Sequence, residues 1–255
     1  MNLGLDLEPL APGMIGRALE MMSGVANFSL SLIPLDWQCY ALGTNYGING
    51  HDLLNVFLQE RILRMVATGV FAIIQLGLVC TSWSRLANPP YRSAGELNGI
   101  SDLPQHKKDW VKQQNVLHDF SLKVCQVSKA AKVRILQREC KVQCMLENGD
   151  RTMLWEHPNT QRVCNEEDGS FHVVDQCQFG VPWQKATRIW ATRLIPGIEH
   201  RCKCGRKHKA VIKGAMRVKL LGVKRPRWLA RSVISAAYPP RLCDLWAASV
   251  DSLFR

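Results

Sequence analysis

The chain alternates short apolar runs with longer segments in which apolar residues recur at helical spacing. The clearest run is Phe71–Cys80, rich in Ile, Leu and Val and closed by small polar residues, which is typical of a central parallel strand leaving a core. Further short strands are expected at 17–20, 37–42, 142–147 and 173–177. Helices are expected after Gly24, over 53–66 and over 110–137. This alternation predicts an α/β fold with a doubly wound, mostly parallel sheet.

Polar residues follow successive strands of this pattern at Ser23-Gly24, Asn45, Asp52 and Cys80. In open α/β sheets, ligands bind beyond the carboxyl ends of the strands. A glycine turn lets the backbone approach a ligand, and the neighbouring polar groups are suited to ribose hydroxyls and an adenine amine. Asp52 is equally well explained as a helix N-cap. Cys80, taken alone, is either a buried core thiol or a nucleophile.

The net charge of +12 is concentrated at the C-terminal end. Residues 185–255 hold 17 Lys and Arg against three acidic residues, a net charge of +14, whereas residues 1–184 hold 16 against 18. Such a block predicts a polyanion partner, with DNA first and RNA as the alternative, although a solvated basic face would have the same composition.

Ten scattered cysteines and an N-terminus without a basic start favour reduced thiols in an intracellular protein, nuclear if eukaryotic. The longest apolar stretch, Val66–Cys80, is too short to cross a bilayer, so no membrane partner is expected. A monomer is expected.

Five segments, in this order, resemble motifs of the cytosine-5 DNA methyltransferases, and most closely the diverged versions carried by some mobile elements. Leu19–Ser29 resembles the Phe-x-Gly-x-Gly turn, and Gly50–Leu53 the motif whose aspartate faces the adenine. Leu78–Ser84 resembles the Pro-Cys-Gln-x-x-Ser nucleophile loop, and Leu146–Gly149 the Glu-Asn-Val motif. Asp175–Arg188 stands where the family carries a Gln-x-Arg-x-Arg strand.

The resemblance implies a Rossmann-like methyltransferase sheet and S-adenosylmethionine as cofactor. The cofactor-binding residues it implies are Glu20, Met21, Ser23, Gly24, Asn45, Asp52 and Leu53. The nucleic-acid contacts expected from the motifs and from the basic tail are Ser84, Gln178, Lys185, Arg201, Arg206, Lys207 and Lys209.

The implied reaction is methyl transfer to carbon 5 of cytosine in DNA. That carbon is a poor nucleophile until a thiolate, here Cys80, adds to carbon 6. A protonated carboxyl, here Glu147, would quench the charge at N3, and burial would raise its pKa for that task. Arg85 and Arg188 are expected to hold the base carbonyl or a phosphate. The target base must first leave the duplex.

Some positions depart from the family pattern. Val79 replaces the proline of the nucleophile loop, Gly149 follows Glu-Asn, only Gly24 remains of the two glycines, and Asn45 stands where an acid is expected. These departures keep open a second function class, a degenerate methyltransferase-like module of mobile-element origin that binds nucleic acid without turnover.

The sequence divides into a methyltransferase-like domain over 1–195 and a small basic extension over 196–255 that packs on or beside it. Four soft ligands lie close together in this extension: His200, Cys202, Cys204 and His208. Their Cys-x-Cys spacing is tighter than a zinc knuckle and no second cysteine pair follows, so no metal is expected. Tyr238-Pro-Pro predicts a turn into a final packing helix with Cys243 in the core.

Overall fold

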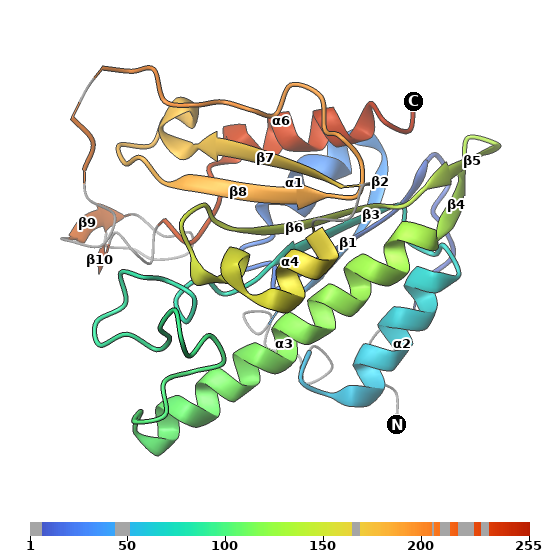
Figure 1. Cartoon of the computed structure of the whole chain (residues 1–255). Coiled ribbons are helices and arrows are strands. Elements are labelled where there is room, and N and C mark those ends of the chain that lie inside the picture. The colour runs from blue at the N-terminus through green and yellow to red at the C-terminus, as the bar shows by residue number, and fades with distance from the viewer. Residues whose placement is uncertain are drawn as a thin grey trace.

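The computed structural model describes residues 7–43, 52–164, 169–205, 207–209, 215–218, 227–230 and 235–255. Its centre is a six-stranded sheet in the order β2-β1-β3-β6-β8-β7 (Figure 1). The strands are β1 (Gly16–Met21), β2 (Trp37–Leu42), β3 (Ile73–Gly77), β6 (Gln143–Gly149), β7 (Ser170–Asp175) and β8 (Ala186–Ala191). All are parallel except β8, which is antiparallel to both of its neighbours. The predicted doubly wound, mostly parallel sheet is confirmed.

Helices cover both faces of this sheet (Figure 1). On one face lie α1 (Asn27–Leu32) and α6 (Pro240–Asp251); on the other lie α2 (Val56–Ala67), α3 (Gln105–Ala130) and α4 (Pro158–Cys164). Two antiparallel pairs stand apart from the sheet: β4 (Lys132–Ile135) with β5 (Arg138–Lys141), and β9 (Ala215–Val218) with β10 (Arg227–Ala230). Three single turns of 3-10 helix complete the described elements: η1 (Ile33–Leu35), η4 (Met153–Glu156) and η5 (Gln176–Phe179).

The chain passes from β1 outward to β2 and then back across β1 to β3, so the winding direction reverses between β1 and β3. A crevice opens at such a switch point, outside the carboxyl ends of the two strands. The carboxyl ends of the parallel strands therefore define the edge of the sheet where a ligand site is expected.

The last helix belongs to the same hydrophobic core as the sheet. Trp246 of α6 packs against Phe28 with ring centroids 4.8 Å apart, and the Trp37 indole donates a hydrogen bond of 2.9 Å to Asp251. Cys243 is fully buried, as predicted. The boundary at residue 195 stays a prediction, but residues 240–254 share the core of the domain.

The helix expected over 110–137 is wrong in its last part. It starts earlier, at Gln105, and ends at Ala130, after which the chain forms the β4–β5 hairpin. The buried residues Val133 and Ile135 follow a period of two, and Leu136 and Gln137 form the turn with positive φ angles of 47° and 66°. This short strand was hidden because its apolar residues continue the stripe of the preceding helix.

No helix in the described part of the chain combines the length and the apolar character that crossing a membrane requires.

Candidate active site at the strand ends

The structure brings the Cys80 loop and Glu147 to neighbouring strand ends. Gly77, the last residue of β3, pairs in register with Glu147 of the parallel strand β6, and Cys80 follows Gly77 by three residues. The Asn148 side chain donates a hydrogen bond of 3.0 Å to the Leu78 carbonyl, which ties the loop to β6. The Cys80 loop and Glu147 thus lie on adjacent strands near the same edge of the sheet.

The carboxyl of Glu147 is enclosed and only 5% exposed. Burial raises its pKa above the ordinary value, while the positive charge of Lys185 and a hydrogen bond from the Tyr238 hydroxyl act in the opposite direction. Gln75 in turn donates to the Tyr238 oxygen at 3.2 Å. Desolvation is the largest influence, so the site favours the protonated carboxyl that a general acid needs.

The segment after Cys80 is held by a buried arginine that the sequence did not reveal. Arg92 is 2% exposed and lies over the Trp83 ring, 3.6 Å from its centroid. It donates to the Ser82 carbonyl at 3.1 Å and to Asn115 at 2.8 Å. These contacts fix the loop by packing and hydrogen bonding. Arg92 thereby stiffens a loop in which Val79 replaces the proline of the family motif.

Both arginines predicted to hold the target base are engaged in ion pairs. Arg85 contacts Glu156, and Arg188 donates to Asp150 at 2.8 Å. Arg188 does stand opposite Asn148 in the pairing of β8 with β6, so it lies one residue from Glu147 in register. Any phosphate or base carbonyl would have to compete with these two acids for the guanidinium groups.

A cavity of about 420 Å³ lies at the switch point, between the turn after β1 and α3. Three residues predicted to bind the cofactor line it, namely Gly24, Asp52 and Leu53. Val79 lines it as well, so the cavity borders the Cys80 loop. The further lining residues, which the sequence did not suggest, are Met22, Gly43, Leu54, Trp110, Gln113, Gln114 and Leu117.

The local structure of Gly24 and Asp52 bears on their predicted roles at the cavity. Gly24 has a φ of +58°, a left-handed conformation that favours glycine, and space remains open where a side chain would stand. Asp52 accepts a hydrogen bond from the Leu54 backbone at 3.0 Å, whereas the N-cap of α2 is Asn55. The alternative reading of Asp52 as a helix N-cap is therefore wrong.

The other predicted cofactor residues that the structure describes, Glu20, Met21 and Ser23, are buried and do not line the cavity. Ser23 donates to the Leu42 carbonyl, which joins the ends of β1 and β2. Met21 is fully buried in the sheet. Glu20 is 1% exposed, and one of its oxygens accepts from the Ser29 backbone at 2.8 Å. Asn45 is not among the described residues.

The predicted nucleic-acid contacts are spread along the same edge. Gln178, Lys207 and Lys209 are exposed, and Ser84 is half-buried. Lys185 donates to the Ser235 carbonyl at 2.9 Å, and Arg201 lies 3.3 Å from the buried carboxylate of Asp175. Arg206 falls outside the described residues.

Of the four soft ligands in the basic extension, three come together. Cys202, Cys204 and His208 converge, and the fourth member of the cluster is Cys177. His200 instead packs on the Phe179 ring at 5.4 Å. Cys177 stands 25 positions before Cys202, so only the folded chain places it beside the others.

No protein-family model matches the chain, and no curated protein matches it. Among solved structures, the methyltransferase EhMeth of Entamoeba histolytica is similar to it, with a TM-score of 0.40 and 9% identity over 77% of this chain and 58% of that protein. The Dnmt2 methyltransferase of S. pombe is similar with a TM-score of 0.34 and 14% identity over 70% of this chain and 50% of that protein.

Both of these proteins are methyltransferases. Identities of 9% and 14% and TM-scores below 0.5 carry nothing about what this chain binds or catalyses. The chain spans between half and three fifths of the length of these two proteins.

Proposed function

We propose that the chain transfers a methyl group from S-adenosylmethionine to carbon 5 of cytosine in DNA. The observation that carries this proposal is the position of the Cys80 loop and of the buried Glu147 carboxyl at adjacent strand ends, next to a cavity at the switch point. A nucleophile and a neutral acid on opposite sides of a flat base are what activation of cytosine requires.

In the proposed reaction, the Cys80 thiolate forms a bond to carbon 6 of the base. The electron pair of the ring double bond moves toward carbon 5, and Glu147 donates a proton to N3 and so limits the charge on the ring. S-adenosylmethionine, when bound, would supply the electrophilic methyl group that carbon 5 takes up, with S-adenosylhomocysteine as the leaving group. The proton on carbon 5 then passes to solvent, the electron pair it leaves re-forms the double bond and expels the Cys80 sulfur as thiolate, and the N3 proton returns to Glu147. Burial raises the pKa of Glu147, which favours the protonated carboxyl that this step uses.

The cavity fits a cofactor of this size, since pockets for small ligands measure about 300–1,000 Å³. Gly24 would bring its backbone against the amino-acid part of the cofactor, and Asp52 and Leu53 would face the adenosine part. Val79 would separate the cofactor from the base, because it lines the cavity and directly precedes Cys80.

DNA is the proposed substrate because four cations of the C-terminal part, Lys185, Arg201, Lys207 and Lys209, lie in segments beside the carboxyl ends of β6 and β7. Lys207 and Lys209 are exposed, which suits phosphate contacts. RNA offers the same phosphate chemistry, so both duplex DNA and structured RNA belong in the assay.

The test is transfer of labelled methyl groups from S-adenosylmethionine to nucleic acid. Cys80→Ser should abolish transfer, because a hydroxyl is almost fully protonated at neutral pH and adds poorly to carbon 6. Glu147→Gln should lower it by at least about 100-fold, because an amide supplies no proton. Cys140→Ser, a half-buried thiol on the distant β5 hairpin, is the matched control and should leave the rate unchanged. Equal activity of Cys80→Ser and Cys140→Ser would refute the assignment of the nucleophile.

A second candidate function is a binding module without turnover. The observation that favours it is the hydrogen bond from the Tyr238 hydroxyl to the Glu147 carboxyl, the group that would have to contact the base. Calorimetric titration with S-adenosylmethionine separates the two functions, since the enzyme must bind the cofactor and a module that has lost its cofactor site gives no heat.

A further inference from the structure

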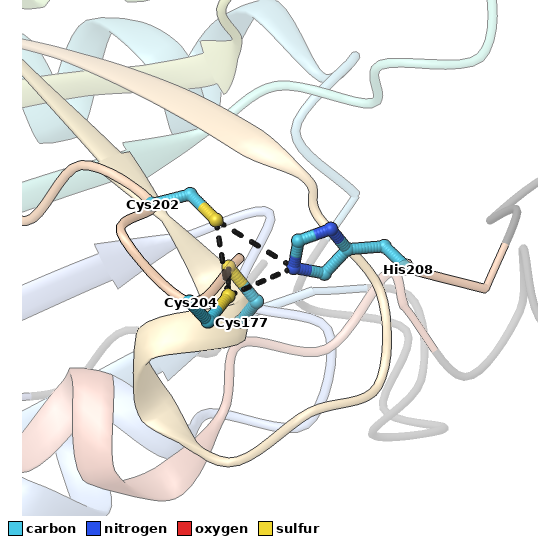
Figure 2. Close-up of side chains that lie close together, drawn as sticks. All are labelled: Cys177, Cys202, Cys204 and His208. Atoms are coloured by element: carbon cyan, nitrogen blue, oxygen red, sulfur yellow. Dashed lines mark hydrogen bonds between the residues drawn. The ribbon is translucent and has the colours of Figure 1, made fainter. Parts of the chain in front are cut away.

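Three thiols and one imidazole converge at the carboxyl end of β7 (Figure 2). Cys177 comes from η5, directly after the strand, and the other three ligands come from the loop around residues 202–208. Their side chains point toward one another, and all four ligand atoms lie within 4.8 Å of each other. Two segments separated by 25 positions in the sequence therefore present soft ligands to a single point.

The distances between these atoms are close to those of a tetrahedral zinc site. With Zn–S bonds near 2.3 Å and Zn–N bonds near 2.0–2.1 Å, neighbouring ligand atoms stand about 3.5–3.8 Å apart. Here the Cys204 Sγ lies 3.9 Å from the Cys177 Sγ and 3.1 Å from the His208 Nε2. The Cys202 Sγ lies 3.6 Å from the same nitrogen and 3.1 Å from the Cys204 Sγ. All four atoms lie within 4.8 Å of one another, so shifts of roughly 0.5–1 Å would admit the ion.

We propose that Cys177, Cys202, Cys204 and His208 bind one zinc ion as a structural site with three thiolates and one imidazole. Four protein ligands of this kind close the coordination sphere, which is the pattern of structural rather than catalytic zinc. The ligand softness excludes calcium and magnesium, which prefer oxygen. The site is separate from Cys80 and Glu147 and does not depend on their chemistry.

Hydrogen bonds outside the cluster already hold the ligand segments in place. The Asp175 carboxylate accepts from the Cys202 backbone at 2.8 Å, and the Lys209 backbone donates to the Pro182 carbonyl at 2.9 Å. The Gln178 amide lies 3.8 Å from the Cys177 sulfur and 3.9 Å from the Cys204 sulfur. Such outer contacts orient ligands and lower the cost of assembling the site.

The turn and the charge around the cluster also suit a metal site. Gly205 follows Cys204 with a φ of +58°, so the chain turns back toward His208 without strain. Three thiolates, a neutral imidazole and Zn²⁺ leave a net charge of −1, and the exposed cations Arg201, Lys203 and Lys207 stand beside it.

A disulfide is the competing use of these sulfurs. The Cys202 and Cys204 sulfurs are 3.1 Å apart, whereas a disulfide requires about 2.03–2.05 Å. A disulfide between them would remove two metal ligands and would not explain why Cys177 and His208 lie beside these two sulfurs. The convergence of all four side chains is explained by a metal and not by a single disulfide.

The site would fix the basic loop beside the proposed active site. β7 runs parallel to β6 and lies two strands from it, so the two carboxyl ends are about 10 Å apart. The zinc would tie the loop around residues 201–209, with its cations, to the end of β7. Removing the metal is expected to loosen this loop while the sheet and α6 keep their packing.

The experiment measures zinc binding by the full chain. Metal-stripped protein in reducing buffer is titrated with zinc against a chromogenic chelator, and bound zinc is counted by mass spectrometry. The expected result is about one zinc per chain. Zinc should also protect the thiols of Cys177, Cys202 and Cys204 from alkylation, and a strong chelator should expose the same three.

Variants then test the ligands. Cys177→Ser and His208→Ala should each weaken zinc binding by at least about 100-fold. The matched controls Cys140→Ser and His200→Ala should keep full affinity. Unchanged affinity of Cys177→Ser, a folded wild type that binds no zinc, or a Cys202–Cys204 disulfide in the reduced preparation would each overturn the proposal. Because alkylation uses the wild type, a variant that fails to fold does not remove the test.

Discussion

Tyr238→Phe removes a single oxygen from the enclosed carboxyl site and tests its electrostatics. In the wild type, the Tyr238 hydroxyl donates to Glu147, and the ring packs on Trp246 with centroids 5.8 Å apart. Phenylalanine keeps the ring packing and leaves the Glu147 oxygen buried without its donor. The pKa of Tyr238 is raised by burial and by the Glu147 carboxylate, so the hydroxyl is a neutral donor at every pH of the assay.

The expected loss of stability depends on the charge of Glu147. A hydrogen bond to a charged group contributes about 1.5–3 kcal/mol, and one between neutral groups about 0.5–1.5 kcal/mol. The variant should therefore lose little stability at acidic pH, where Glu147 is protonated, and more at alkaline pH. For a chain of this size, the larger loss corresponds to a fall in Tm of roughly 3–12 °C.

The direction with pH follows from the raised pKa of Glu147. A carboxyl whose pKa is higher in the folded than in the unfolded chain contributes stability below its unfolded pKa and loses that contribution as pH rises through its folded pKa. The hydrogen bond from Tyr238 lowers the pKa of Glu147 in the folded chain. Tyr238→Phe therefore raises that pKa further, and the variant loses more stability than the wild type as the pH rises.

Chemical unfolding at pH 5 and pH 8 measures both effects. Tyr40→Phe is the matched control, because the Tyr40 hydroxyl accepts from the neutral Gln38 amide at 2.8 Å and its loss should be independent of pH. In the Glu147→Gln background, Tyr238→Phe should also lose its pH dependence. An equal loss at both pH values in the wild-type background would refute the assignment of a buried, titrating Glu147.

Two further predictions concern the partners of the site. Replacing Lys203, Lys207 and Lys209 together by Gln should weaken the salt dependence of binding to duplex DNA. The slope of log K against log salt, measured by anisotropy titration, should fall in magnitude by about 2.7, because each lost phosphate contact contributes about 0.9. An unchanged slope would show that this loop does not contact phosphate. Gly24→Val should abolish the heat of S-adenosylmethionine binding in calorimetry, because valine is strained at a φ of +58° and its side chain would stand at the cavity wall. The control is Gly180→Ala, at an open turn outside the cavity, which should keep the heat of binding.

The sequence predicts the sheet well where apolar runs end in polar residues. The strand expected at 37–42 is β2 itself, and the run before Cys80 is the central strand β3. The β3 pattern follows from burial on both faces, which leaves little room for polar residues until the strand ends. β2 is an edge strand with a mostly half-buried centre, and its sequence mixes bulky and polar residues. Glu147 was found for the same reason, as the polar residue near the end of β6.

The rest depends on contacts between segments that are distant in the sequence. Tyr238 reaches Glu147 across 91 positions, and Arg92 supports the Cys80 loop from a segment that reads as an ordinary polar loop. Cys177 and Cys202 are not spaced along the sequence in a way that indicates a shared metal. Periodicity and local spacing contain no information on such pairs, because tertiary packing alone brings them together.

The placement of α6 also changes how the basic tail can be tested. Trp246 and Val250 are fully buried, so deleting residues 201–255 would remove part of the core along with the charge. Point substitutions in the exposed loop separate the two effects, since surface changes away from the core usually alter stability by less than about 0.5 kcal/mol.

Covalent trapping on duplex DNA with 5-fluorocytosine at the target positions tests the central claim most directly. Fluorine at carbon 5 cannot leave as a proton, so the bond between the Cys80 sulfur and carbon 6 persists after methyl transfer and can be mapped by peptide mass spectrometry. We expect an adduct on Cys80 that requires S-adenosylmethionine and is lost in Cys80→Ser but kept in Cys140→Ser. An adduct on another cysteine, or no adduct over a library of duplex sequences with a folded wild type that binds the cofactor, would contradict it.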